Sequence, residues 1–148
     1  MTTPEVKSID KEKIKDILND KKGKMKLSLF VCAHCGLCAE SCPLYRAHDR
    51  NPEYMPSYKV INSLGKLYKK IKKLDRNFLE EIKELIWKNC VLCGRCYCPL
   101  GIDIPSMIAL ARGVCRSQGI SGVYPHSLGA PEEDFPEALS HIGVSEKE

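Results

Sequence analysis

Apolar residues recur every three or four positions in several stretches of the chain, which is the spacing of amphipathic helices. The first such stretch, residues 6–18, places Ile14, Ile17 and Leu18 among lysines and acids, and we expect Gly23 to end its helix. No stretch of useful length alternates apolar and polar residues as a half-buried strand would. The pattern predicts a mostly α fold.

A helical hairpin is predicted in the middle of the chain. Apolar residues form one face of a helix over residues 60–71. The pattern repeats over residues 74–87, where Asp75 and Asn77 are candidate N-caps. The second helix of this hairpin therefore runs directly into the cysteines that follow it.

A third helix is predicted over residues 106–114, because Asp103 can cap it and Pro105 is tolerated in a first turn. Beyond Gln118 the chain is rich in glycine and proline and loses its periodicity. Two interpretations of residues 119–148 stay open, an extended arm that orders on a partner and a disordered tail.

The length of 148 residues and the hydrophobic content of 43% fit one compact domain. We expect a basic helical extension over residues 1–27, the main domain over 28–118 and the arm over 119–148. No apolar run approaches the roughly 20 residues that span a bilayer, and the first 26 residues are charged rather than holding an apolar signal core. We therefore expect a soluble, cytoplasmic protein without a membrane span.

The net charge of +4 is unevenly distributed along the chain. Residues 11–26 and 66–73 are basic and residues 132–137 are acidic, an asymmetry that suggests docking surfaces of opposite sign. No recognition motif for nucleic acid accompanies the basic stretches, so we expect no nucleic-acid partner.

Nine cysteines in a chain without an export signal indicate thiolate ligands rather than disulfides, since the count is odd and the cytosol is reducing. Eight of them form two dense runs that each end in Cys-Pro. The runs are Cys32, Cys35, Cys38 and Cys42 before Pro43, and Cys90, Cys93, Cys96 and Cys98 before Pro99. The first run has the spacing C-x2-C-x2-C-x3-C-P, which is typical of a cubane iron–sulfur cluster in the bacterial ferredoxin pattern.

Three cysteines at two-residue gaps can wrap one cubane, with the loop amides facing the sulfurs. Gly36 and Gly94 follow the second cysteine of each run, where a residue without Cβ permits a positive φ or a close approach to the cluster. In two-cluster ferredoxins the cysteine before the proline ligates the other cluster. By that rule the predicted ligands are Cys32, Cys35, Cys38 and Cys98 for cluster 1, and Cys90, Cys93, Cys96 and Cys42 for cluster 2.

Zinc is the alternative metal, but zinc sites usually pair two C-x2-C knuckles across a longer stretch. The gap between Cys96 and Cys98 is shorter than the pattern expects. A helical turn would point these two thiols to different clusters, whereas an extended segment would point both the same way. Cys115 is then a substitute ligand or, as we prefer, a buried small hydrophobe. His34 is not expected to be a ligand.

Lys88 and Arg95 flank the second run. Positive charge beside an anionic cluster favours its reduced form and raises its potential. Solvated surface charges are an equally acceptable interpretation.

The order of these features resembles the C subunit of heterodisulfide reductase and its relatives. The resemblance covers roughly residues 28–118 and is carried by FVCAHCGLCAESCP, by the lysine-rich hairpin and by CVLCGRC and CPLGIDI. It implies an α-helical ferredoxin domain with two [4Fe–4S] clusters in a hetero-oligomeric complex. The subunit would relay electrons between a flavin-bearing A-like subunit and a catalytic B-like subunit, without being an enzyme by itself.

The same module is similar to the iron–sulfur domains of sulfite-reductase-associated complexes and of flavin-dependent dehydrogenases for glycerol phosphate and glycolate. B-type subunits carry paired-cysteine motifs, and this chain has no adjacent cysteines. Within the family we favour the branch that works in sulfur oxidation. The alternative of a different class is a zinc-stabilised module that binds a protein partner.

Overall fold

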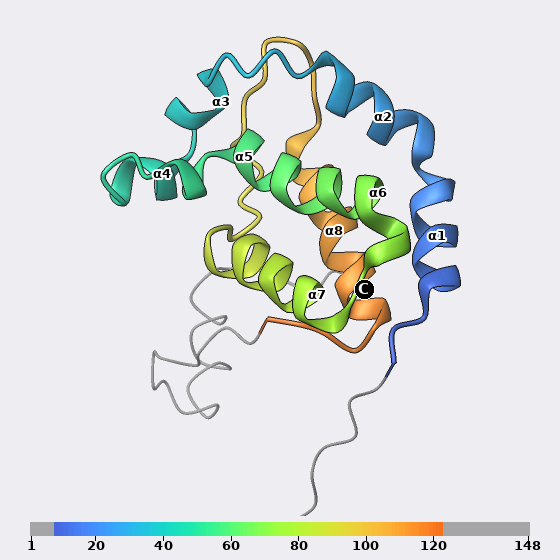
Figure 1. The fold of residues 1–148 in the computed structure, drawn as a ribbon. Helices are drawn as coiled ribbons and strands as arrows, with labels where there is room; N and C mark the ends of the chain where they lie inside the picture. The colour runs from blue at the N-terminus through green and yellow to red at the C-terminus, as the bar shows by residue number, and fades with distance from the viewer. Residues whose placement is uncertain (1–7, 123–148) are drawn as a thin grey trace, which may run out of the picture.

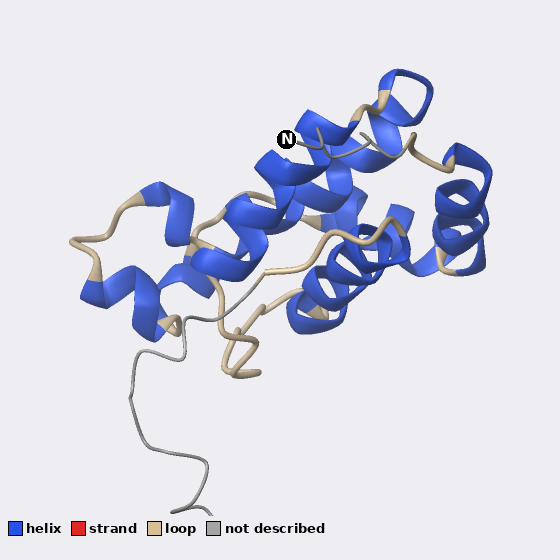
Figure 2. Cartoon of the chain, turned by 90° about the horizontal axis from the view of Figure 1, so that it is seen from below, coloured by secondary structure: helices blue, strands red, loops and turns tan. Residues whose placement is uncertain are grey.

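The structure is a computed structural model that describes residues 8–122. Over that range it consists of helices and connecting loops, with no strand (Figure 2). The predicted mostly α fold is confirmed. Residues 123–148, which make up most of the predicted arm, lie outside the described residues, as do residues 1–7 at the start of the first predicted helix.

Two helices, α1 (Lys11–Asp20) and α2 (Lys22–Val31), lie along one side of the molecule (Figure 1). Asp10 caps α1 by accepting a hydrogen bond from the Lys13 amide at 2.9 Å. The prediction that Gly23 ends this helix was wrong, because Gly23 does not adopt a positive φ and lies in the first turn of α2.

The central hairpin is built from two nearly continuous helical arms (Figure 1). Its first arm consists of α5 (Pro56–Val60), the π-helical η2 (Ile61–Gly65), α6 (Lys66–Lys70) and the short η3 (Ile71–Lys73). Its second arm consists of α7 (Arg76–Lys83) and the π-helical η4 (Glu84–Lys88). Asp75 caps α7 by accepting from the Phe78 amide at 2.7 Å, whereas the other candidate cap, Asn77, lies inside the helix.

The last described helix, α8 (Ile104–Ser117), packs against α1, α5, α7, η2 and η4. Its cap is the predicted one, since Asp103 accepts from the Ser106 amide at 3.2 Å. Asp103 also pairs with Lys24 at 2.8 Å and so ties the start of α8 to α2. The helix begins before the predicted Ser106 and continues past the predicted end at Val114.

Three shorter elements lie at the opposite end of the molecule from α1 (Figure 1). They are α3 (Leu37–Glu40), α4 (Pro43–Ala47) and η1 (Pro52–Tyr54). Proline occupies the first position of α4 and of η1, where its missing amide hydrogen costs no helical hydrogen bond. The proline that follows the first cysteine run therefore starts a helix.

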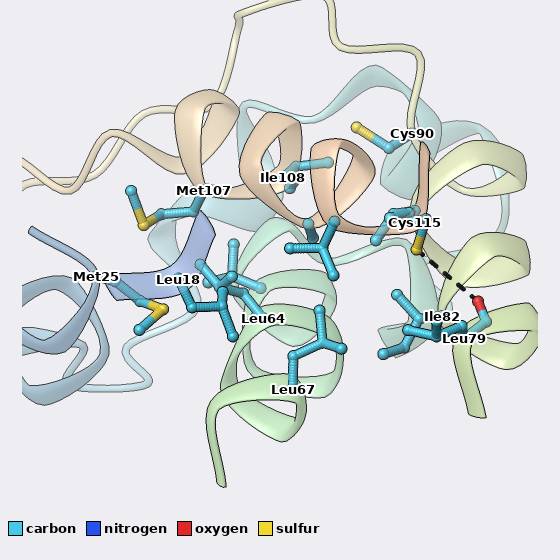
Figure 3. Packing of buried hydrophobic residues seen from close by; sticks show 14 of the residues in the cluster. Leu18, Met25, Leu64, Leu67, Leu79, Ile82, Cys90, Met107, Ile108 and Cys115 are labelled. Atoms are coloured by element: carbon cyan, nitrogen blue, oxygen red, sulfur yellow. Dashed lines mark hydrogen bonds between the residues drawn. The ribbon is translucent and has the colours of Figure 1, made fainter. Parts of the chain in front are cut away.

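The core lies between the hairpin, α8 and the two N-terminal helices (Figure 3). Leu64 and Leu67 from the hairpin and Ile108 from α8 are completely buried in it. Ile14 and Met25 are equally buried, so the helices of the predicted N-terminal extension share the core of the rest of the chain. Within residues 8–122 no helix has both the length and the apolar character needed to cross a bilayer.

Candidate functional site

The eight cysteines of the two runs lie around two separate cavities. The first cavity is lined by Cys32, Cys35, Cys38 and Cys98. The second cavity is lined by Cys42, Cys90, Cys93 and Cys96. Each predicted ligand set is thus brought to one cavity, with three thiols from one run and the fourth from the other. Binding of a cluster by these thiols stays a prediction.

The two cysteine loops repeat the same unusual backbone conformation. In the first loop φ is +53° at His34 and +76° at Gly36, on either side of Cys35. In the second loop φ is +52° at Leu92 and +73° at Gly94, on either side of Cys93. Turns that mix left-handed and right-handed residues gather backbone amides into a concavity that binds anions. The loops therefore have the backbone that an anionic cluster requires.

The positive φ of the two glycines agrees with the sequence, and histidine adopts this region more often than most residues, but the positive φ of Leu92 does not follow from residue type. A bulky leucine adopts this conformation only where the surroundings impose it. In the second loop the Leu92 amide donates to Cys90 Sγ at 3.4 Å, which is the orientation expected of amides that face ligand sulfurs. The strain at Leu92 thus coincides with a backbone contact to a predicted ligand.

The fourth cysteine of the first cavity, Cys98, comes from the segment between η4 and α8. This segment passes behind α5 and rises to the loop between α2 and α3 (Figure 1). The Tyr97 amide donates to Ser41 Oγ at 2.9 Å and fixes the segment there. Cys96 and Cys98 are not in a helical turn, yet they line different cavities.

The helix α5 forms part of the wall of both cavities. Ser57 and Val60, three residues apart and on one face, line the first cavity together with Ile61. Lys59 lies on the opposite face and lines the second cavity. One short helix therefore presents different chemistry to the two sites.

One thiol of the second cavity, that of Cys96, has a strongly raised pKa. Burial raises the pKa of the Cys96 thiol to about 12, and repulsion from Cys90, Cys42 and Cys93 acts in the same direction. The ammonium group of Lys59 opposes this shift in pKa. Without a bound cation Cys96 therefore holds its proton at neutral pH, and a metal that binds here must displace it.

Two buried cations lie beside the second cavity, and the sequence analysis missed both. Lys59 Nζ donates to the Asn89 carbonyl at 2.7 Å and lies 4.0 Å from Cys42 Sγ. Arg112 donates to the carbonyls of Ile86 and Cys90. The position of Arg112 within the apolar face of α8 could have indicated that its side chain is buried. Nothing in the sequence distinguishes Lys59 from the other lysines of the hairpin.

The two cations that the sequence did single out, Lys88 and Arg95, are exposed and line neither cavity. Their interpretation as solvated surface charges fits the structure better than a role in tuning the cluster. Trp87 is buried, as expected of core packing, and the Arg112 guanidinium lies 5.0 Å from the centre of its ring.

The ninth cysteine belongs to the core rather than to either cavity. Cys115 is completely buried, and its thiol donates to the Leu79 carbonyl at 3.9 Å (Figure 3). Burial raises the pKa of this thiol to about 12, with Glu80 adding to the shift and Lys83 opposing it. Cys115 thus packs as a small hydrophobe, as the sequence indicated.

The donor set in each cavity is four thiols, which is the chemistry that a cubane iron–sulfur cluster requires. Over residues 8–122 no three His, Cys, Asp or Glu side chains meet closely enough to hold a single metal ion. These residues and loops fit two [4Fe–4S] clusters.

Two curated relatives share sequence similarity with the chain. It is 29% identical over 117 residues to the Hdr-like menaquinol oxidoreductase iron–sulfur subunit of Archaeoglobus profundus, covering 69% of this chain and 21% of that protein. It is 29% identical over 130 residues to the Hdr-like menaquinol oxidoreductase iron–sulfur subunit 2 of Archaeoglobus fulgidus, covering 78% of this chain and 23% of that protein. The chain spans between a fifth and a quarter of the length of these relatives. No solved structure matches it.

The resemblance to Hdr-like iron–sulfur subunits that the cysteine motifs indicated is confirmed by these relatives. A family model described as a 4Fe-4S dicluster domain matches residues 28–102, which include both cysteine runs and the hairpin between them. That range is half of the chain, and the protein therefore belongs to the 4Fe-4S dicluster domain family.

Proposed function

We propose that the chain is the electron-transfer subunit of an Hdr-like oxidoreductase complex and that it carries two [4Fe–4S] clusters. The observation that carries this proposal is the division of eight thiols between two cavities within the region matched by the dicluster family. The likeness to iron–sulfur subunits of Hdr-like complexes supports the same role.

The proposed ligands follow the two cavities. Cluster 1 is held by Cys32, Cys35, Cys38 and Cys98. Cluster 2 is held by Cys90, Cys93, Cys96 and Cys42. Each cluster then joins two segments that lie far apart in the sequence, so that metal binding also fixes the fold of the loops.

The role in the complex is relay rather than catalysis. The two second cysteines of the loops, Cys35 and Cys93, are exposed, so each proposed cluster has an edge near the surface where a partner can approach. Cys115, the thiol outside the cavities, is buried with a raised pKa and is unsuited to attack a substrate. The proposed partners are a B-like subunit that handles a disulfide or another sulfur substrate and an A-like flavin subunit, in the cytoplasm.

A second candidate concerns the electron donor. Both relatives are named as subunits of menaquinol oxidoreductases. By analogy, the chain would take electrons from a partner that oxidises a membrane quinol instead of from a flavin subunit. An iron–sulfur subunit of another flavin-dependent dehydrogenase or of a sulfite-reductase-associated complex remains an alternative assignment for the same two clusters.

Reconstitution without oxygen tests the central proposal. The expected result is about eight irons per chain, four for each cubane, with two reducible centres that interact in the EPR spectrum. A colourless, air-stable protein that holds two equivalents of zinc would contradict it. That outcome would favour the zinc-stabilised binding module.

A further inference from the structure

Lys59 is the only buried lysine in residues 8–122, with 1% of the residue's surface exposed. Lysine normally keeps its ammonium group in water even where its alkyl chain is buried. Burying the charge is costly unless hydrogen bonds and a group of opposite charge compensate for the loss of water. The surroundings of Lys59 must therefore supply that compensation.

The contacts of the ammonium group lead to the second cavity. Nζ donates to the Asn89 carbonyl at 2.7 Å and lies 4.0 Å from Cys42 Sγ. Within the described part of the chain no Asp or Glu forms an ion pair with it. The groups that face the ammonium are thus the Asn89 carbonyl and the Cys42 thiol, and the four thiols of this cavity would become anionic ligands when a cluster binds.

Lys59 lines only one of the two cysteine cavities. Among residues 8–122, no lysine or arginine lines the first cavity, where α5 contributes Ser57 and Val60. Lys59 lies on the other face of this helix and lines the second cavity. The fold therefore gives the two proposed clusters different electrostatic surroundings.

A cubane with four thiolate ligands is anionic, and one-electron reduction adds a further negative charge without making or breaking a bond. A buried cation stabilises the reduced form more than the oxidised form, and the low local dielectric strengthens this effect. We propose that Lys59 raises the reduction potential of cluster 2 by holding its ammonium group beside Cys42. This rests on the proposed function, since it requires a cluster in the second cavity.

The exposed cations near the second run provide matched controls. Lys88 and Arg95 are close to the same cysteines in sequence but line neither cavity. Water and salt screen their charges from the cluster. Their replacement is expected to leave the potential where it is.

The test is an EPR-monitored redox titration of the reconstituted full chain with Lys59→Met, Lys59→Arg and Lys88→Met. In Lys59→Met the reduction constant of one cluster is expected to fall by at least about tenfold, which is about 59 mV for a one-electron couple. The other cluster should keep its potential. Lys59→Arg, which retains the charge, and Lys88→Met should behave as the wild-type protein does.

Unchanged potentials in a Lys59→Met protein that holds the wild-type amount of iron would overturn the proposal. If Lys59→Met loses a cluster, Lys59→Gln provides the second neutral variant, in which the amide can still donate to the Asn89 carbonyl. Loss of the cluster in both neutral variants, with full iron in Lys59→Arg, would make Lys59 a residue of cluster assembly and also overturn it. A wild-type chain that takes up no iron would refute the proposed function instead, so the two failures are distinguishable.

Discussion

Cys96 and Cys98 are separated by one residue, yet their thiols line different cavities. The chain achieves this without a helical turn, because the Tyr97 amide is held by Ser41 and the segment continues through Cys98 toward the first loop. This arrangement makes the two runs exchange one cysteine each. It also makes the exchange testable by choosing which cysteines are replaced together.

Paired cysteine variants distinguish exchanged from local ligation. In the exchanged arrangement Cys32→Ser with Cys98→Ser damages cluster 1 alone, and about four irons per chain should remain. Cys32→Ser with Cys42→Ser damages both clusters and should leave far less iron. Iron and sulfide analysis after anaerobic reconstitution measures the difference. The opposite ranking of the two double variants would show that each run holds its own cluster.

Arg112 is predicted to stabilise both the fold and the second cluster. It donates to the carbonyls of Ile86 and Cys90, and Arg112→Met would remove these buried hydrogen bonds. Such a loss should lower the free energy of unfolding by about 2–3 kcal/mol. Anaerobic denaturant unfolding and iron analysis measure the two effects, and cluster 2 should be lost more readily than cluster 1.

Arg116 provides the matched control for this variant. Its guanidinium also lies near the Trp87 ring, at 5.5 Å, but the side chain is exposed. Arg116→Met should therefore change the free energy of unfolding by less than about 1 kcal/mol. Equal destabilisation by the two variants would show that stacking on Trp87, rather than the buried hydrogen bonds, carries the effect.

The sequence correctly predicted the helices with strong apolar periodicity and the N-caps Asp75 and Asp103, because both depend on local chemistry. The prediction that Gly23 ends the first helix was wrong, because burial of Met25 favours a second helix directly after the first. The cysteine spacing also placed the eight thiols in two sets, and their binding of clusters stays a prediction. Spacing carries this information because three cysteines at two-residue gaps suit one cubane, and in two-cluster ferredoxins the cysteine before the proline belongs to the other site.

The burial of the Lys59 side chain could not be predicted from the sequence. Lys59 differs from the exposed lysines of the hairpin only because the segment containing Asn89 folds over it, and that contact joins residues 30 positions apart. Properties that arise from distant segments meeting in space leave no local pattern in the sequence.

Removal of iron is predicted to release the loops before the core. The hairpin, α1 and α8 share buried contacts through residues such as Leu18, Leu64 and Ile108. Leu18 and Leu64 line neither cavity, and Ile108 lines the second. The exposed Arg95 lies between two proposed ligands in a loop without helical structure. Chelation should therefore accelerate tryptic cleavage after Arg95 by about tenfold or more, since cleavage follows local opening.

The far-UV circular dichroism of the chelated protein should keep most of its helical signal. Cleavage after Lys13, within α1 and away from both cavities, serves as the internal reference and should change much less. Uniform acceleration at both positions, with loss of the helical signal, would show that the clusters hold the entire fold together.

Cys115 gives a prediction for the dependence of stability on pH. Its pKa is raised from 9.0 to about 12 in the folded protein, chiefly by burial. Above pH 9 the unfolded chain loses this proton while the folded chain retains it, so the unfolded state gains stability as the pH rises. The contribution of Cys115 is fully present below pH 9 and is lost progressively toward pH 12, by about 1.4 kcal/mol per pH unit.

The measurement compares the wild-type protein with Cys115→Ala, which lacks this one thiol, by anaerobic denaturant unfolding between about pH 8 and pH 10.5. Below pH 9 the wild-type protein should be more stable by a constant amount, because alanine leaves a small void beside Leu79. Above pH 9 that advantage should shrink. A difference that stays constant across the range would mean that the thiol reaches water in the folded state, and Cys115 would then also react with iodoacetamide in the native protein.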